Sequence, residues 1–123
     1  MMGGAVARCR RGYVWTEEGF RMDCFWMLGF FQRLRGLLGT FPGQATGSAL
    51  VFEHTHSLHT LGMRYPIDVA FLDGDGRVVM SERAVRPGRV RFCRQGLTAV
   101  EREASASPWF ILGDVPRFVC GTQ

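Results

Sequence analysis

The stretch "IDVAFLDGDGRVVMSERAV", residues 67–85, indicates the fold more strongly than any other part of the sequence. Its first six residues alternate between two sets of side chains, with Ile67, Val69 and Phe71 in one set, as in a β-strand. The "DGDG" segment that follows, residues 73–76, is rich in residues that tolerate a positive φ. A second run, rich in valine, comes after it. This pattern predicts a β-hairpin.

Further segments have the composition of short strands bounded by glycine or proline, which favours a small β-sandwich or barrel. These segments are "SALVFEH" (48–54), "RVRFC" (89–93), "LTAVERE" (97–103) and "WFILGDV" (109–115). In "RPGR", residues 86–89, proline precedes glycine as in a type II turn. The strands therefore account for most of the chain after residue 47.

One earlier segment has a different period. In "CFWMLGFFQRLRGLL", residues 24–38, apolar residues recur at spacings of three and four, which predicts a helix. Gly39 could end it. We therefore expect a mostly β fold with a minor α component. It would be a small distorted β-sandwich or barrel-like domain with one principal helix near residues 24–38.

The bulk composition is that of a globular domain. The chain has 123 residues, of which 46% are hydrophobic and 21% are charged. We expect a single domain over residues 1–123, with a loose N-terminal segment at residues 1–12. The most apolar run, "CFWMLGFF" at residues 24–31, is too short for a membrane span, which takes about 20 residues. No signal peptide is visible, so a cytoplasmic location is the default expectation.

All fifteen basic residues are arginines, and the net charge is +4. The densest group consists of Arg77, Arg83, Arg86, Arg89, Arg91 and Arg94. A basic sheet face there could contact RNA or another anion. On a strand, however, Phe92 would point away from Arg89 and Arg91, so no stacking platform would form. We favour a solvated face, and a nucleic-acid partner is not expected.

Three histidines within six positions suggest metal ligation. On a strand, His54 and His56 would share a face, and His59 could join them after a bend. Asp68 or Glu53 could complete the site. We favour histidines that hold no metal, and we expect no cofactor. A metal-dependent enzyme using His54, His56 and His59 remains an alternative.

The four cysteines, Cys9, Cys24, Cys93 and Cys120, form no C-x-x-C pair. We expect free, mostly structural thiols, with Cys9 and Cys120 the most exposed. Cys93 together with a distant histidine would make a thiol pair, so a thiol enzyme is a further alternative. The absence of a more specific catalytic pattern leads us to expect no enzymatic activity.

Several stretches resemble one known family. "RLRGLLG" (33–39) and "SLHTLGMRYPIDVAFLDGDGRVV" (57–79) resemble the opening and the central motif of the domain-of-unknown-function 192 family, in its short bacterial form. Weaker matches are "RPGRVRFCRQGLTAVERE" (86–103) and "LGDV" (112–115). The resemblance spans about residues 30–115. Within the central motif it rests on Ser57, His59, Thr60, Met63, Arg64, Pro66, Ile67, Asp68, Phe71, Leu72, Asp73, Gly76 and Val78.

The resemblance implies a small, mostly β fold close to a distorted sandwich. The family has no established activity, so no catalytic residue can be carried over. His59 falls on the family pattern, whereas His54 and His56 do not, so a metal site that needs them would be peculiar to this chain. The stretch "AVEREASAS", residues 99–107, departs from the family, so a groove lined by that strand could be altered.

The central motif allows a structural and a ligand-binding interpretation. Arg64 is close enough in sequence to pair with Asp68 or with a ligand carboxylate, and the structural interpretation is favoured. The candidate ligand-binding residues are His59, Thr60, Met63, Arg64 and Asp68. We expect a non-enzymatic binding or accessory module that presents "LHTLGMRYPID" (58–68) to a small ligand or a protein. The enzyme and the basic anion- or RNA-contacting module are alternatives, and no oligomeric state is indicated.

Overall fold

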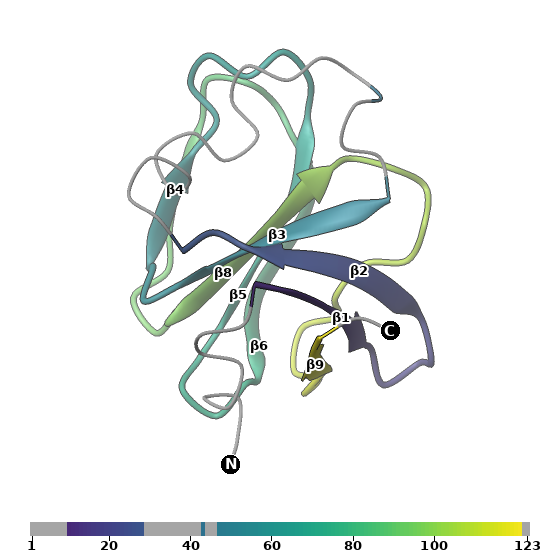
Figure 1. Cartoon of the computed structure of the whole chain (residues 1–123). Helices are drawn as coiled ribbons and strands as arrows, with labels where there is room; N and C mark the ends of the chain where they lie inside the picture. Colours follow the sequence, from purple (N-terminus) through teal and green to yellow (C-terminus); the bar gives the residue numbers. More distant parts are fainter. Residues whose placement is uncertain (1–9, 29–42, 44–46, 122–123) are drawn as a thin grey trace.

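A computed structural model describes residues 10–28, 43 and 47–121 (Figure 1). Within these residues the chain forms strands only. They are β1 (Arg11–Trp15), β2 (Arg21–Trp26), β3 (Ser48–Glu53), β4 (Ser57–His59), β5 (Ile67–Leu72), β6 (Val78–Val85), β7 (Val90–Phe92), β8 (Thr98–Glu103) and β9 (Arg117–Cys120). Seven strands make one open sheet in the order β6-β5-β8-β3-β2-β1-β9, and β4 pairs with β7 in a separate ribbon.

The sheet is mixed because β2 and β3 pair in parallel, while every other pair is antiparallel. The predicted hairpin is confirmed as β5 and β6. Its turn is held by Asp73, whose carboxylate accepts the backbone N–H groups of Asp75 (2.9 Å) and Arg77 (3.0 Å). Gly76 takes a positive φ of 81° there, as the glycine-rich turn required.

The expected helix near residues 24–38 is not supported. Residues 24–26 lie in β2, residues 29–38 fall outside the described part, and the described residues contain no helix. The side chains of β2 alternate strictly between exposed and buried, with Met22, Cys24 and Trp26 buried. This period of two outweighs the helical spacing, which was drawn from residues further along the chain. The described residues also include no helix that is long and apolar enough to cross a membrane.

Where a distorted sandwich or barrel was expected, the strands form one open seven-stranded sheet with a two-stranded ribbon packed on one of its faces. The expected strand at residues 109–115 is an irregular segment. It covers the sheet with Trp109 and Phe110, which are 3% and 4% exposed. The indole N–H of Trp109 donates to the backbone oxygen of Val69 (3.0 Å) and fixes the segment against β5. Two adjacent aromatic residues here serve as a cover, and a strand pattern does not distinguish the two roles.

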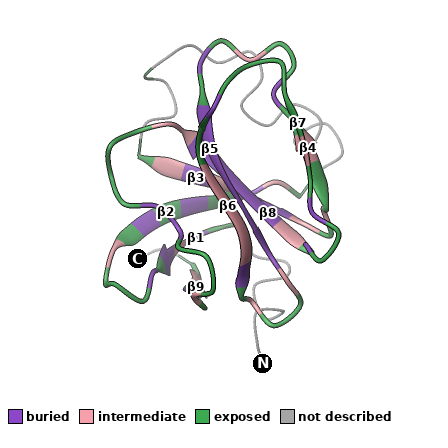
Figure 2. Cartoon of the chain, turned by 180° about the vertical axis from the view of Figure 1, so that it is seen from behind, coloured by how far each residue is buried: buried purple, intermediate pink, exposed green. Residues whose placement is uncertain are grey.

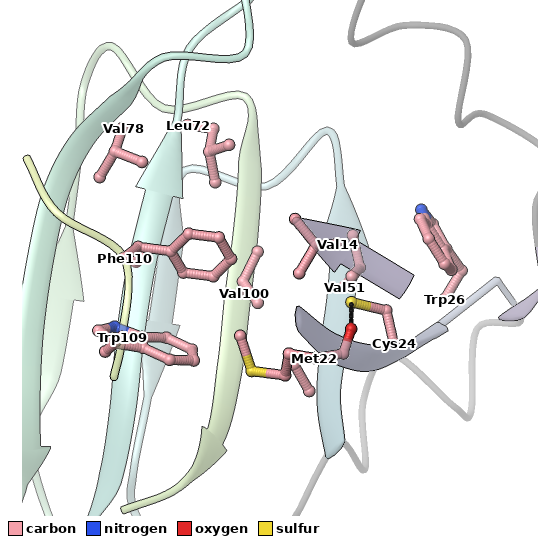
Figure 3. Close-up of a cluster of buried hydrophobic side chains, with 12 residues drawn as sticks. Val14, Met22, Cys24, Trp26, Val51, Leu72, Val78, Val100, Trp109 and Phe110 are labelled. Atoms are coloured by element: carbon pink, nitrogen blue, oxygen red, sulfur yellow. Dashed lines mark hydrogen bonds between the residues drawn. The ribbon is translucent and has the colours of Figure 1, made fainter. Parts of the chain in front are cut away.

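Both faces of the sheet are covered at its centre, so all six residues of β5 are buried (Figure 2). On one face, Trp109 and Phe110 close a core that reaches from β6 to β1 (Figure 3). Its other members are Val14, Met22, Cys24, Trp26, Ala49, Val51, Ala70, Leu72, Val78 and Val100. On the other face, the β4–β7 ribbon and the loop before β5 pack down through Leu58 and Tyr65.

The cysteines differ from one another. Cys24 and Cys93 are buried and free, as expected. Cys120 is disulfide-bonded, which corrects the expectation that it is a free thiol. Cys9 lies outside the described residues.

Candidate functional site

The central motif begins in the two-stranded ribbon formed by β4 and β7. Leu58 lies opposite Arg91 in the register, and both side chains face the body of the protein. Leu58 packs against the core clusters under the ribbon. The guanidinium of Arg91 makes two hydrogen bonds to the Glu82 carboxylate on β6, at 2.7 and 2.9 Å. An apolar contact and a bidentate ion pair therefore anchor the ribbon to the main sheet.

The outer side of the ribbon carries the alternate residues. His59 lies opposite Val90, and Ser57 lies opposite Phe92, so these four side chains share the outward face. Val90 is 62% exposed and Phe92 is 63% exposed. Leu61, just past β4, is 52% exposed. We call this surface, defined by Ser57, His59, Leu61, Val90 and Phe92, the ribbon face.

Thr60 ties the two turns beside the ribbon together. Its side chain is fully buried, and its hydroxyl donates to the backbone oxygen of Arg86 (2.7 Å) while accepting the N–H of Arg89 (2.7 Å). Its backbone N–H donates to the oxygen of Arg89, and its oxygen accepts the N–H of Gly88. The hydroxyl is therefore committed to holding the 86–89 turn against the motif.

Asp68 is buried beneath the sheet, with 1% of its side chain exposed, and its partner is Arg102. Arg102 Nε donates to Asp68 Oδ2 at 2.9 Å from the directly opposite position on β8. The other oxygen of Asp68 accepts the N–H of Ala84 (2.9 Å), a residue with a positive φ of 54° at an irregularity in the β5–β6 pairing. The carboxylate therefore accepts one hydrogen bond from the bulge in β6 and another from Arg102.

The Arg102 side chain makes further contacts with the segment that follows β8. Its Nη2 donates to the backbone oxygen of Ser107 (2.8 Å), and its guanidinium lies 4.6 Å from the ring centre of Trp109. The ion pair thus connects the sheet to the covering segment 104–116. Arg102 was missed as a partner of Asp68, because only the β5–β8 register places these two residues opposite each other.

The structure separates the five candidate ligand-binding residues into two groups. His59 and Arg64 are exposed. Thr60 and Asp68 are buried, and both make the internal hydrogen bonds described above. Met63 is partly buried against the cluster around Tyr65. Sequence reasoning also missed the exposed Val90 and Phe92, which only the pairing of β4 with β7 brings beside His59.

The three histidines do not share a strand. β3 ends before His54, which has a positive φ of 56°. His56 Nδ1 lies 2.9 Å from the Gly96 backbone oxygen and therefore carries a proton there. His59 Nδ1 accepts the N–H of Leu61 at 3.2 Å. Across the described ranges, no three histidine, cysteine, aspartate or glutamate side chains are grouped as a metal site would require.

The arginines of residues 77–94 are spread over several internal contacts. Arg77 donates to the backbone oxygen of Gly113 (2.7 Å), and Arg83 donates to the oxygens of Ser105 and Ser107. Arg91 is paired with Glu82. Arg86, Arg89 and Arg94 are exposed at the two ends of β7. The run is therefore divided between the segment 105–113 and the ribbon, and Arg86, Arg89 and Arg94 lie in the turns next to the ribbon face.

Two pKa shifts follow from these surroundings. The hydrogen bonds from Arg91 hold the pKa of the Glu82 carboxyl below its ordinary value. Burial, with a smaller contribution from Asp23, raises the pKa of the Cys24 thiol to about 12. Cys24 is therefore a poor nucleophile near neutral pH, since the thiolate is the reactive form.

Residues 14–106 match the family DUF192, described as "Uncharacterized ACR". The match covers more than half of the chain, so the chain belongs to this family, as its motifs indicated.

Two solved structures share the fold. One, described as a "putative transcription regulator" from Sinorhizobium meliloti 1021, has a TM-score of 0.67 and 18% identity, over 88% of this chain and 92% of that one. The other is a protein of unknown function from Novosphingobium aromaticivorans DSM 12444. It has a TM-score of 0.66 and 15% identity, over 87% of this chain and 83% of that one. The search of curated proteins found no match.

Proposed function

We propose that this chain is a non-enzymatic binding module whose ribbon face docks an extended protein segment that carries apolar and acidic side chains. The observation that carries the proposal is the outward pair Val90 and Phe92, each more than 60% exposed on a regular strand. Large apolar side chains that gather on a surface are typical of interaction sites. The apolar part of the partner follows from this pair.

The exposed arginines around the ribbon face indicate that the partner also carries acidic side chains. Arg86 and Arg89 lie in the turn before β7, Arg94 lies in the turn after it, and Arg64 lies in the loop after β4. All four are exposed. Guanidinium groups around an apolar centre favour carboxylates at the matching positions of a partner. His59, between the apolar residues, adds a ring nitrogen that can donate a hydrogen bond.

The ribbon face rests on a rigid support, which reduces the entropy cost of binding. Leu58 packs on the core beneath the ribbon, Thr60 holds the neighbouring turns together, and Arg91 is anchored to Glu82. In this proposal Thr60 and Asp68 shape the motif without touching the partner. His59 and Arg64 contact it.

The test is a selection of random peptides displayed on phage, with the full chain as the target. A Val90→Thr/Phe92→Thr variant serves for counter-selection, because threonine keeps the β propensity of both positions. We expect the enriched peptides to combine apolar residues with aspartate or glutamate. A synthetic copy should lose about tenfold or more in affinity for the variant by calorimetry, as expected for anchor residues.

Leu112→Ser is the matched control, since Leu112 is 66% exposed in a different turn. It should leave the peptide affinity unchanged. A selection that converges on no sequence would refute the proposal. So would peptides that bind the Val90→Thr/Phe92→Thr variant as tightly as the natural chain.

A further inference from the structure

A second exposed face lies at the other end of the sheet, on β2, β1 and β9, away from the ribbon (Figures 1 and 2). The alternation of β2 buries Met22, Cys24 and Trp26 and leaves Arg21, Asp23 and Phe25 outside. The same alternation on β1 buries Val14 and turns Tyr13 and Trp15 outward. This end of the sheet thus has one core face and one face with aromatic and charged side chains.

The register arranges the outer side chains in rows. Trp15 lies opposite Arg21 on one side and opposite Arg117 on the other. In the next row Tyr13 lies opposite Asp23, and in the row after that Arg11 lies opposite Phe25. Directly opposite residues of an antiparallel pair have Cβ atoms about 5 Å apart. A row with a tryptophan between two arginines and a row with an arginine beside a phenylalanine therefore flank the row of Tyr13 and Asp23.

Contacts confirm that rings and guanidinium groups lie together on this face. The guanidinium of Arg21 is 4.0 Å from the ring centre of Tyr13, and that of Arg11 is 5.7 Å from the ring centre of Phe25. The rings of Tyr13 and Trp15 meet edge to face at 6.4 Å. Even so, Trp15 and Phe25 keep 36% and 37% of their surface exposed.

A depression of about 170 Å³ lies among these groups. Its lining includes Arg11, Tyr13, Arg21, Asp23 and Phe25. The β1–β9 pairing that borders it depends on glycine, because a Cβ on Gly12 would come within 2.0 Å of the Val119 backbone oxygen. The depression is thus lined by two rings, two guanidinium groups and one carboxylate.

We infer that this face binds single-stranded nucleic acid, and we name it the β1 platform (Arg11, Tyr13, Trp15, Arg21, Phe25 and Arg117). Unpaired bases stack on aromatic rings and on guanidinium planes, and guanidinium groups also bind the phosphates between the bases. The platform offers both groups in alternation. Arg11 and Trp15 are four residues apart on one strand, about 13 Å. That span gives room for more than one nucleotide.

One acidic group, Asp23, lies in the middle row of the platform, opposite Tyr13. Its carboxylate is paired with Arg21, with 3.7 Å between Oδ1 and Nη2, and the platform's three arginines outnumber this one carboxylate. Glu17 and Glu18 lie in the β1–β2 turn, beyond Trp15, and Glu17 Oε2 accepts the N–H of Val115 (2.8 Å). The platform is distinct from the arginines of residues 77–94, which lie on other strands and turns.

The test measures fluorescence anisotropy of labelled twelve-nucleotide oligouridylate and oligoadenylate with the full chain, over a series of salt concentrations. Saturable binding is expected, with a slope of log affinity against log salt near −2, since three phosphate contacts on a single strand give about −0.7 each. A duplex of the same length should bind at least about tenfold more weakly, because its bases are not free to stack.

Variants then locate the binding. Trp15→Ala should weaken it about tenfold, whereas Trp15→Phe, which keeps a ring, should stay within about twofold of the natural chain. Arg21→Ala should reduce the salt slope by about 0.7. Phe92→Ala and Arg94→Ala are matched controls on the ribbon side, and both should leave the affinity and the slope unchanged.

Three results would overturn the inference: no saturable binding, equal binding of single strand and duplex, or equal affinity for a sulfated polysaccharide of matched charge. Equal losses in Trp15→Ala and Phe92→Ala would likewise exclude the β1 platform as the site. None of these results bears on the peptide selection against the ribbon face, so the two proposals fail separately.

Discussion

At the scale of single residues, the central motif contains one half of a buried ion pair, between Asp68 and Arg102. The Asp68 carboxylate is 1% exposed and accepts hydrogen bonds from Arg102 and Ala84. Its position opposite Arg102 joins the middle of the sheet to the segment that covers it. This pair gives the motif aspartate a structural role.

Removing one member of this pair should be costly, because it leaves an uncompensated charge in the interior. Arg102→Met should lower the free energy of unfolding by about 3–5 kcal/mol, measured by urea denaturation. The double variant Asp68→Asn/Arg102→Met should be more stable than Arg102→Met alone, because the stranded charge is then gone. A loss below about 1 kcal/mol in the single variant would contradict this account.

The Cys24 thiol should resist alkylation in the folded protein. Its pKa is raised to about 12, chiefly by burial, so the thiolate fraction at pH 8 is on the order of 10⁻⁴. Mass spectrometry after treatment with iodoacetamide at pH 8 should find Cys24 unmodified in the native chain and modified in urea. Rapid native labelling of Cys24 would show that β2 opens far more readily than its burial implies.

At the scale of elements, the ribbon depends on a few anchors to the main sheet. β4 and β7 are three residues each, and a short two-stranded ribbon is barely stable by itself. Leu58 supplies the apolar anchor, and the pair of Arg91 with Glu82 on β6 supplies the polar one. The ribbon face is therefore presented by the sheet that carries it.

The polar anchor should weaken in acid. A carboxyl whose pKa is lowered on folding stabilises the folded chain above its unfolded pKa, and this contribution disappears as the pH falls through the folded value. Natural chain and Glu82→Gln should therefore differ in free energy of unfolding at pH 7 and converge towards pH 3. The difference should be small, because both side chains are partly exposed. A difference that does not change with pH would exclude this contribution.

Elements with local signals were predictable from the sequence, and elements set by distant pairing were not. Strand alternation and a glycine-rich turn lie within the β5–β6 hairpin itself, so the hairpin could be predicted. β2 was mistaken for the start of a helix, since the apolar residues after it suggested another period. The segment at 109–115 looked like a strand, because burial against a sheet selects the same residues as pairing within one.

The same limit applied to the candidate site. The motif was recognisable, and its histidine, arginine and aspartate were named, but the only partner considered for Asp68 was its sequence neighbour Arg64, with a ligand carboxylate as the alternative partner of Arg64. The true partner, Arg102, is opposite Asp68 only because β5 and β8 are adjacent. Val90 and Phe92 likewise become a surface beside His59 only through the β4–β7 pairing. A pairing partner far along the chain leaves no local trace in sequence periodicity.

At the scale of the whole molecule, the open sheet separates two kinds of surface. The ribbon covers one face near β5, while β1 and β2 extend beyond it with their outer side chains exposed (Figure 2). Covered strands at the centre give stability, and the less covered end remains available for contacts. A closed barrel of the same strands would offer no such end.

The pairing of β1 with β9 also bears on how the chain is made. β1 and β2 leave the ribosome before the other described strands, and β9 emerges after them. Until then Trp15 has Arg21 beside it but not Arg117. The nascent chain can form the central hairpin well before the outer row is complete, so the β1 platform is assembled only after β9 has emerged.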